Sequence, residues 1–211
     1  MFHPLLRRRG LYAITDGPRV DPVAAAQAAL EGGAVLLQYR NKTAENRRRL
    51  DEARALAELS ARLGVPLIVN DDVELALASG GAGVHLGKDD VPVAQARAAL
   101  GNDAIIGVSC YDSLERARDA SAAGADYLAF GAFFPSPTKP DARRATPSLL
   151  REARMFGKPL VAIGGVTPDN GGSLIAAGAD FLAVVSAVFA AQDIRAAARR
   201  FTELFASTHT R

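Results

Sequence analysis

The sequence predicts a single-domain (β/α)8 TIM barrel of the α/β class over residues 1–211. Eight short apolar runs alternate with stretches of helical character, which is typical of parallel strands joined by helices. Glycine recurs where a helix gives way to a strand, at Gly33, Gly81, Gly124 and Gly178, because a left-handed residue commonly ends a helix. Eight such units favour a closed barrel over a doubly wound sheet. The chain is short for this fold, so its loops must be short.

The predicted strands are residues 11–15, 34–39, 67–70, 83–86, 104–109, 126–130, 159–163 and 181–186. Asp21-Pro22 is expected to open the first helix, since Asp is a preferred cap and Pro suits the first helical position. A long Ala/Arg/Leu-rich helix is expected from Thr43 to Gly64, followed by a short helix that ends near Ser79.

The second half repeats the same signals. Pro92 precedes an Ala-rich helix, and Asp112 is the expected cap of the next one, with Glu115 three residues later. A polar loop over residues 135–146 leads to a helix that Pro147 opens. Thr167-Pro168 opens another helix, and residues 193–205 form the last, amphipathic one. We find no linker or low-complexity segment.

Composition narrows the functional class. A formal net charge of +2 gives no strong overall field, so we expect neither a nucleic-acid nor a membrane partner. Cys110 is the one cysteine, and we interpret it as structural because no activating neighbour is evident. No apolar stretch approaches the ~20 residues that span a bilayer, and no signal peptide is recognised. We therefore expect a cytoplasmic protein and leave a homo-oligomer open.

Two predicted strands end in carboxylates. Asn70-Asp71-Asp72 follows one strand, and Asp89-Asp90 follows the next. If these strands are parallel neighbours, about 5 Å apart, Asp71 and Asp90 could face one small space, where a cation such as Mg²⁺ would relieve their repulsion. The alternative is that the acids cap helices, and Asp72 and Asp89 are the expected caps. His85 lies among apolar neighbours and is interpreted as structural.

Cations gather at the same predicted edge. Arg40 and Lys42 are two residues apart in an extended stretch, so both can face one ligand, and Lys139 adds a third cation from the long loop. Cations, acids and small hydroxyls together favour a Mg²⁺–pyrophosphate site. The alternative for Arg40 and Lys42 is ordinary surface charge.

A second anion site is expected after the seventh and eighth strands, where barrels often bind phosphate. Gly164-Gly165 lets backbone N–H groups approach an anion near a helix start, and Val185-Ser186 ends the neighbouring strand. The alternative is that the glycine pair merely makes a tight turn.

The ordered motifs resemble those of the thiamine-phosphate synthase family, also called thiamine-phosphate pyrophosphorylase. The resemblance covers nearly the whole chain. It rests on Leu11-Tyr12-Ala13-Ile14-Thr15-Asp16, Gln38-Tyr39-Arg40-Asn41-Lys42, Val69-Asn70-Asp71-Asp72, Gly83-Val84-His85-Leu86-Gly87-Lys88-Asp89-Asp90, Ile106-Gly107-Val108-Ser109, Pro135-Ser136-Pro137-Thr138-Lys139 and Ile163-Gly164-Gly165-Val166.

The resemblance implies a transferase that acts on two small phosphorylated substrates. 4-Amino-2-methyl-5-(diphosphomethyl)pyrimidine would lose pyrophosphate, and the nitrogen of 4-methyl-5-(2-phosphooxyethyl)thiazole would capture the pyrimidinylmethyl cation to give thiamine phosphate. By motif position, the pyrimidine pyrophosphate would be held by Gln38, Arg40, Lys42, Asn70, Ser109 and Lys139. Lys139, Ser109 and Arg40 would be the catalytic members. Asp71 and Asp90 would bind Mg²⁺. The thiazole phosphate would be held by Ser136, Thr138, Gly165, Val185 and Ser186.

Two alternatives remain open. A thiazole tautomerase would share the barrel and bind thiazole phosphate while transferring a proton. A non-catalytic regulator would bind the phosphorylated ligand without turnover. The tautomerases resemble this chain less around the pyrophosphate ligands, which here include Arg40, Lys42, Asn70, Asp71, Asp90 and Lys139. The intact pair of Asp71 and Asp90 argues against the regulator.

Overall fold

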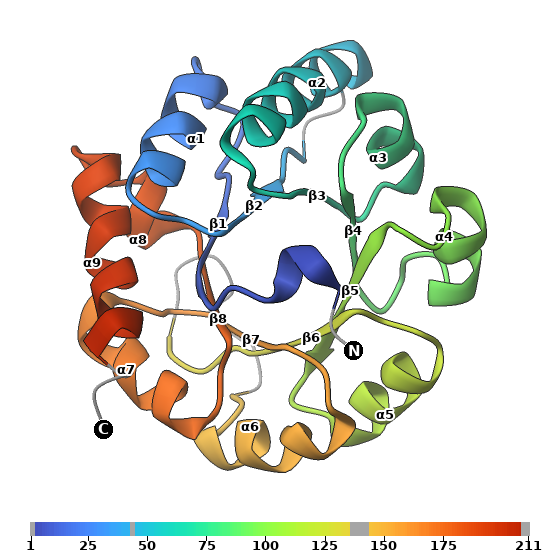
Figure 1. Ribbon diagram of the computed structural model, residues 1–211, viewed down its shortest axis with the longest axis vertical. Helices are drawn as coiled ribbons and strands as arrows, with labels where there is room; N and C mark the ends of the chain where they lie inside the picture. The colour runs from blue at the N-terminus through green and yellow to red at the C-terminus, as the bar shows by residue number, and fades with distance from the viewer. Residues whose placement is uncertain (1–2, 43–44, 136–143, 208–211) are drawn as a thin grey trace.

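The protein is a closed eight-stranded parallel barrel surrounded by helices, as the computed structural model shows (Figure 1). The structure describes residues 3–42, 45–135 and 144–207. The strands pair in chain order, and β1 (Gly10–Ile14) closes the barrel against β8 (Phe181–Val184). The (β/α)8 fold predicted from the alternation is therefore confirmed.

The remaining strands are β2 (Leu36–Tyr39), β3 (Leu67–Asn70), β4 (Gly83–Leu86), β5 (Ile105–Tyr111), β6 (Tyr127–Phe130) and β7 (Leu160–Ile163). The α-helices are α1 (Pro22–Glu31), α2 (Asn46–Leu63), α3 (Val73–Ser79), α4 (Val93–Leu100), α5 (Leu114–Ala122), α6 (Pro147–Ala153), α7 (Pro168–Ala177), α8 (Ser186–Phe189) and α9 (Ile194–Ser207). Short 3-10 helices are η1 (Pro4–Leu6) and η2 (Arg154–Phe156).

Two helix starts differ from the prediction. α2 begins at Asn46 with Glu45 at its N-cap, and Thr43, where it was predicted to start, lies outside the described residues. Ser113, not Asp112, caps α5 by accepting from the Arg116 N–H at 3.1 Å, because an irregularity after Ser109 carries β5 on to Tyr111. Asp72 caps α3 as expected, with its carboxylate accepting from the Leu75 N–H at 2.8 Å.

Three further expectations at element ends are wrong. Asp89 caps no helix, because Pro92 occupies the N-cap of α4. β8 stops at Val184, and Ser186 opens the short helix α8 because the Val185 backbone turns away from the extended conformation. The left-handed glycine after α3 is Gly80 rather than Gly81, since Gly80 has a φ of 74°.

The core has two layers. The larger cluster of buried side chains packs between the sheet and the helices, whereas a smaller cluster fills the barrel interior. The interior cluster contains Leu6, Tyr12, Ile14, Val35, Leu36, Ile68, Ile105, Tyr127, Ala129, Val161, Phe181 and Ala183. A filled interior leaves the rim at the strand ends as the place for a ligand.

The N-terminal segment closes one end of the barrel. In Figure 1 it crosses the barrel opening as a short helix before it enters β1. Leu6 of this segment is 3% exposed and packs into the interior cluster, while the His3 ring Nε2 lies 3.0 Å from the Asp103 carbonyl oxygen across the opening. This end is therefore occupied by protein, and the carboxyl ends of the strands form the open end.

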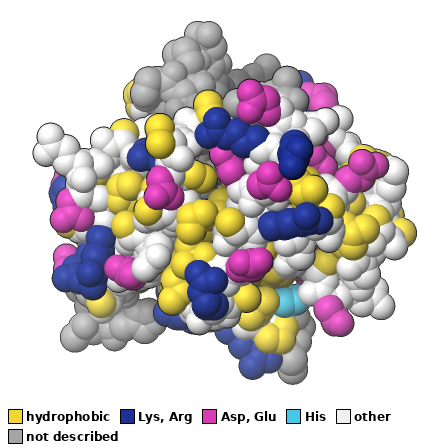
Figure 2. Space-filling view, turned by 90° about the horizontal axis from the view of Figure 1, so that it is seen from above, with side chains coloured by type: hydrophobic (Ala, Val, Ile, Leu, Met, Phe, Trp, Pro, Cys, Tyr) yellow, Lys and Arg dark blue, Asp and Glu magenta, His cyan; other side chains and the backbone are white. Residues whose placement is uncertain are grey.

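The surface in Figure 2 carries basic and acidic side chains interspersed among apolar ones. Among the described residues, no helix combines the length and apolar character that crossing a membrane would require.

Candidate active site

The rim at the carboxyl ends of the strands brings together most of the predicted site residues. Asn70 ends β3 and pairs in register with His85 on β4, and Ser109 lies on β5, the next strand along. Arg40 and Lys42 follow β2, while Gly165 follows β7. Ser136, Thr138 and Lys139 lie outside the described residues, so their predicted roles stay predictions.

The carboxyl groups of Asp71 and Asp90 face each other. Asp71 follows β3 in the left-handed region, with a φ of 63°, and its N–H donates to the His85 carbonyl at 2.8 Å. Asp90 Oδ2 accepts from the Gly87 N–H at 2.6 Å. Burial and the neighbouring Asp90 carboxyl raise the pKa of Asp71 above its ordinary value of 3.8, and Lys42, 3.7 Å away, offsets this only in part. A non-glycine residue in this conformation is typical of a functional site.

This pair suits a hard cation. Two facing carboxylates repel unless a proton or a cation lies between them, and Mg²⁺ prefers oxygen ligands. The described part of the chain holds no cluster of three or more His, Cys, Asp or Glu that could enclose a metal alone. A Mg²⁺ ion held by Asp71 and Asp90 would therefore need ligands from substrate and water, which is how Mg²⁺ commonly binds in phosphate sites.

The raised pKa of Asp71 predicts how stability depends on pH without metal. A carboxyl whose pKa is higher in the folded state favours folding below its unfolded pKa, and this contribution is lost as the pH rises through the folded pKa. We expect the unfolding free energy of Asp71→Asn to exceed that of the wild type by a margin that grows over that range. Urea unfolding at several pH values, with and without Mg²⁺, measures it. A margin independent of pH, or one that Mg²⁺ leaves unchanged, would contradict this interpretation.

The Thr15 hydroxyl fixes the backbone just after the end of β2. The Thr15 hydroxyl, at the end of β1, accepts from the Arg40 N–H at 2.8 Å and donates to the Arg40 carbonyl at 3.1 Å. The half-buried Arg40 guanidinium makes no hydrogen bond or ion pair with any described residue. The Arg40 backbone is thus fixed, and no described residue competes with an anion for its side chain.

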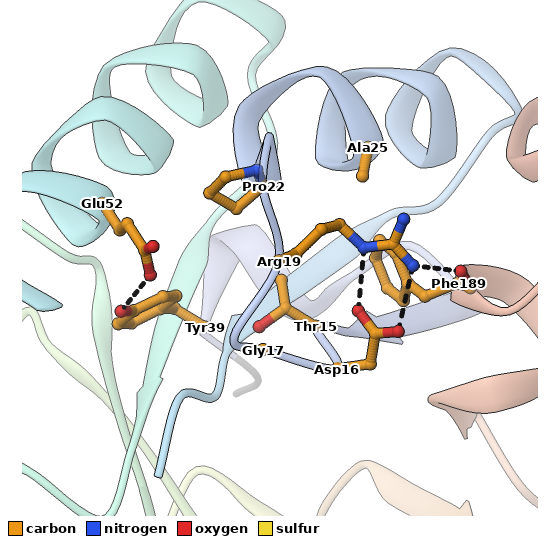
Figure 3. Close-up of a pocket in the computed structure, with 9 residues that line it drawn as sticks. All are labelled: Thr15, Asp16, Gly17, Arg19, Pro22, Ala25, Tyr39, Glu52 and Phe189. Carbon is orange, nitrogen blue, oxygen red and sulfur yellow. Dashed lines mark hydrogen bonds and ion pairs between the residues drawn. The ribbon is translucent and has the colours of Figure 1, made fainter. Parts of the chain in front are cut away.

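A cluster of ion pairs braces the loop that follows β1. Arg19 donates twice to the Asp16 carboxylate, at 3.0 Å each, and also to the Phe189 carbonyl at the end of α8 (Figure 3). In the same view the Tyr39 hydroxyl donates to Glu52 on α2 at 2.7 Å. The cavity among these groups measures about 10 Å³, room for one water molecule at most. The ion pairs therefore stabilise the rim, and the cavity between them is too small to bind a substrate.

Gln38 and Ser109 are joined by a buried chain of hydrogen bonds that sequence reasoning missed. Gln38 donates to the Tyr12 hydroxyl at 2.6 Å, and the hydroxyls of Tyr12 and Tyr127 lie 2.9 Å apart. His85 Nδ1 lies 2.9 Å from the Tyr127 hydroxyl, and His85 Nε2 lies 2.8 Å from Ser109 Oγ. Both ring nitrogens of His85 therefore have hydrogen-bond partners, and one partner, Ser109, is a predicted substrate ligand.

Arg116 on α5 ties two parts of the rim together, which the sequence did not reveal. Its Nε donates to the Ser109 carbonyl at 2.6 Å, and its NH2 group donates to the Gly87 carbonyl at 2.9 Å. The guanidinium also lies over the Tyr111 ring, 5.7 Å from the ring centroid. One side chain therefore fixes Ser109 relative to the loop that carries Asp90.

The glycine pair after β7 makes a tight turn. Gly164 and Gly165 have φ values of 99° and 64°, and a side chain at Gly165 would overlap the backbone carbonyls of Phe134 and Pro135. The structure therefore supports the alternative that the glycine pair makes a tight turn. Because both residues are glycines, the turn presents no side chain to an anion at this position. Ser186, at the start of α8, follows the adjacent strand. A phosphate at this turn stays a prediction.

The chain matches known proteins along almost its entire length. The thiamine monophosphate synthase family matches residues 11–188. The thiamine-phosphate synthase of Methylobacillus flagellatus is 53% identical over 207 residues, which cover 96% of this chain and 98% of the relative. That of Thioalkalivibrio sulfidiphilus is 56% identical over 203 residues, covering 94% and 96%.

A solved structure extends the match to three dimensions. The thiamine phosphate pyrophosphorylase from Pyrococcus furiosus is 36% identical, superposes with a TM-score of 0.88, and is matched over 96% of this chain and 98% of its own. These findings confirm the synthase and transferase assignment that the motifs predicted. The chain belongs to the thiamine-phosphate synthase family.

Proposed function

We propose that this protein joins the pyrimidine diphosphate to the thiazole phosphate at the carboxyl-terminal rim, with release of pyrophosphate. The observation that carries the proposal is the Asp71–Asp90 pair, with Lys42 3.7 Å from Asp71 and Arg40, whose guanidinium is bonded to no described residue, on the same rim. Facing acids surrounded by cations suit a metal-bound pyrophosphate better than a lone phosphate.

The pyrophosphate half of the site would use Gln38, Arg40, Lys42, Asn70, Ser109 and Lys139. Their task is to hold the leaving group and to stabilise its charge as the methylene C–O bond breaks and the electron pair departs with pyrophosphate. Mg²⁺, when bound by Asp71 and Asp90, would neutralise that charge and make pyrophosphate a better leaving group. Lys139, Ser109 and Arg40 are proposed to contact the departing oxygens directly.

The thiazole half would use Ser136, Thr138, Gly165, Val185 and Ser186 to hold the phosphate of the second substrate. With that phosphate fixed, the thiazole nitrogen would face the pyrimidinylmethyl carbon, and its lone pair would form the new C–N bond. Both substrates are then oriented before bond formation, which needs no general base. A cytoplasmic location suits a biosynthetic enzyme of this class.

An end-point assay tests the proposal. The purified protein is incubated with both substrates and Mg²⁺, and thiamine phosphate and pyrophosphate are quantified together. We expect equal amounts of both, lost on adding a chelator and restored by excess Mg²⁺. Thiazole phosphate binding without either product would contradict the synthase and favour the tautomerase or the non-catalytic regulator, which a direct assay of thiazole proton transfer separates.

A further inference from the structure

The barrel interior contains an unbroken hydrogen-bonded path between two strands that are not neighbours. It runs from Gln38 on β2 through Tyr12 on β1, Tyr127 on β6 and His85 on β4 to Ser109 on β5. Its two ends are residues proposed to hold the same pyrophosphate-bearing substrate. Tyr12, Tyr127 and His85, which connect the two ends, have no proposed substrate-binding role.

Burial makes the direction of each hydrogen bond decidable. Gln38, Tyr12 and Tyr127 are at most 2% exposed, and His85 is 9% exposed, so their polar hydrogens need acceptors. The Gln38 amide nitrogen can only donate, so the Tyr12 oxygen accepts from it. Among the described residues, the remaining partner of the Tyr12 hydroxyl is Tyr127, so the Tyr12 O–H donates there.

The same reasoning continues along the path. Tyr127 accepts from Tyr12 and has its own hydrogen to place, and His85 Nδ1 is 2.9 Å away, so Nδ1 is the acceptor. A neutral imidazole with a bare Nδ1 carries its hydrogen on Nε2, which then donates to Ser109 Oγ at 2.8 Å. The Ser109 hydroxyl hydrogen is left free to point away from His85. The reverse order would leave the buried Tyr12 hydrogen without an acceptor in the described part of the chain.

We propose that Tyr12 and Tyr127 are positioning residues that hold His85 as the Nε2–H tautomer and thereby keep the Ser109 hydroxyl as a donor toward the departing pyrophosphate. The inference deepens the proposed function and rests on it, because it assumes that Ser109 contacts that group. In this proposal both tyrosines act on the reaction through His85 and Ser109.

Packing fixes the rings as well as the hydrogen bonds. The Tyr127 ring stacks on the His85 ring with centroids 5.6 Å apart and an 18° angle between the planes. The Tyr12 ring meets Tyr127 edge-on at 6.0 Å and 89°. Gly107 on β5 supplies the space, because a Cβ there would overlap the Tyr127 ring. Burial raises the pKa of both tyrosines, so both phenols keep the hydrogen that the path requires.

A double-mutant cycle tests whether Tyr127 acts through Ser109. We expect Tyr127→Phe to lower kcat on the order of tenfold with little change in KM, since one aligned donor is lost. In the Ser109→Ala background the same substitution should have no further effect, because the hydroxyl it positions is gone. Additive losses in kcat would overturn the proposal. Tyr12→Phe, which breaks the path one bond earlier, should behave in the same way.

Nitrogen NMR of the unliganded protein provides a second test that needs neither substrate nor activity. The His85 signals of a ¹⁵N-histidine sample are identified by their loss in His85→Gln. We expect protonated Nε2 and bare Nδ1 in the wild type, and a second tautomer with protonated Nδ1 in Tyr127→Phe. Tyr39→Phe is the matched control, because it removes a buried tyrosine hydroxyl that faces Glu52 outside the barrel, and it should leave the His85 signals unchanged.

The two tests distinguish an error in the positioning role of Tyr12 and Tyr127 from an error in the proposed function. A wild type with protonated Nδ1, or a Tyr127→Phe spectrum identical to that of the wild type, would overturn the positioning role even if the enzyme makes thiamine phosphate. A wild type that makes no thiamine phosphate would remove the proposed function, whatever the tautomer of His85.

Discussion

Asp71→Asn should reduce Mg²⁺-dependent formation of thiamine phosphate by at least about a hundredfold, because metal stabilisation of a departing oxyanion is worth several kcal/mol. Asparagine removes the charge but keeps the shape of the side chain. It also tolerates the left-handed backbone at this position, where φ is 63°, better than alanine does. The folded protein should therefore survive, and kcat at saturating substrates across a Mg²⁺ titration measures the effect.

Asp89→Asn is the matched control for this substitution. Asp89 is exposed, lies next to Asp90 in sequence, and loses the same charge without removing a proposed metal ligand. We expect its activity and its Mg²⁺ dependence to stay within about twofold of the wild type, since an exposed charge that faces water contributes little to local interactions. Equal losses in Asp71→Asn and Asp89→Asn would mean that overall charge, and not a metal held at Asp71, sets the activity.

Gly107→Ala should destabilise the barrel by about 3 kcal/mol, the upper end of the range for overpacking a core. The added methyl group would overlap the ring of Tyr127, which is fully buried inside the barrel, so the ring or the strand would have to shift. Displacement of Tyr127 would also separate its hydroxyl from His85, so activity should fall in the fraction that stays folded. Equilibrium unfolding in urea measures the loss of stability.

Gly172→Ala shows what the same chemical change does without the overlap. Gly172 lies in α7, and a Cβ there would meet no atom within 4 Å. Alanine favours helix over glycine by about 1 kcal/mol, so this variant should be slightly more stable than the wild type. A Gly107→Ala protein as stable as Gly172→Ala would show that the interior can repack around Tyr127, contrary to our account.

The fold could be predicted from the sequence because the apolar runs, the glycines and the short connections all indicate the same alternation of strands and helices. Apolar runs alternate with helices, and left-handed glycines at Gly33, Gly124 and Gly178 fall where helices end. Strand order then follows from short connections, and the strand ends place Asp71 and Asp90 on one rim. Asp71 and Asp90 could be predicted because each directly follows a strand in the sequence.

The buried path could not be found in this way. Tyr12 and Tyr127 lie 115 residues apart on strands that do not pair, and their hydroxyls meet only because both point into the barrel. A tyrosine in an apolar strand reads as core packing, which both residues also provide. The available signal was glycine at an inward position, Gly107, which indicates that a large ring from another strand fills the space.

The helix starts were misassigned for a local reason. Asp112 and Ser113 are both good caps, and a single irregularity in β5 decides between them. Asp89 and Asp90 are likewise equivalent by residue type. Asp90 turns back to accept from the Gly87 N–H, and Pro92 rather than either acid occupies the cap of α4. Backbone geometry of this kind depends on how the strands pack.

The most direct test of the metal–pyrophosphate site is an anomalous difference map from crystals grown with Mn²⁺ and pyrophosphate. We predict a Mn²⁺ peak at about 2.0–2.4 Å from a carboxylate oxygen of Asp71 and of Asp90, with pyrophosphate oxygens completing its ligands and facing Arg40 and Ser109. A peak elsewhere on the molecule, or pyrophosphate bound beside Gly165 and Ser186 with no metal at the two aspartates, would contradict the account.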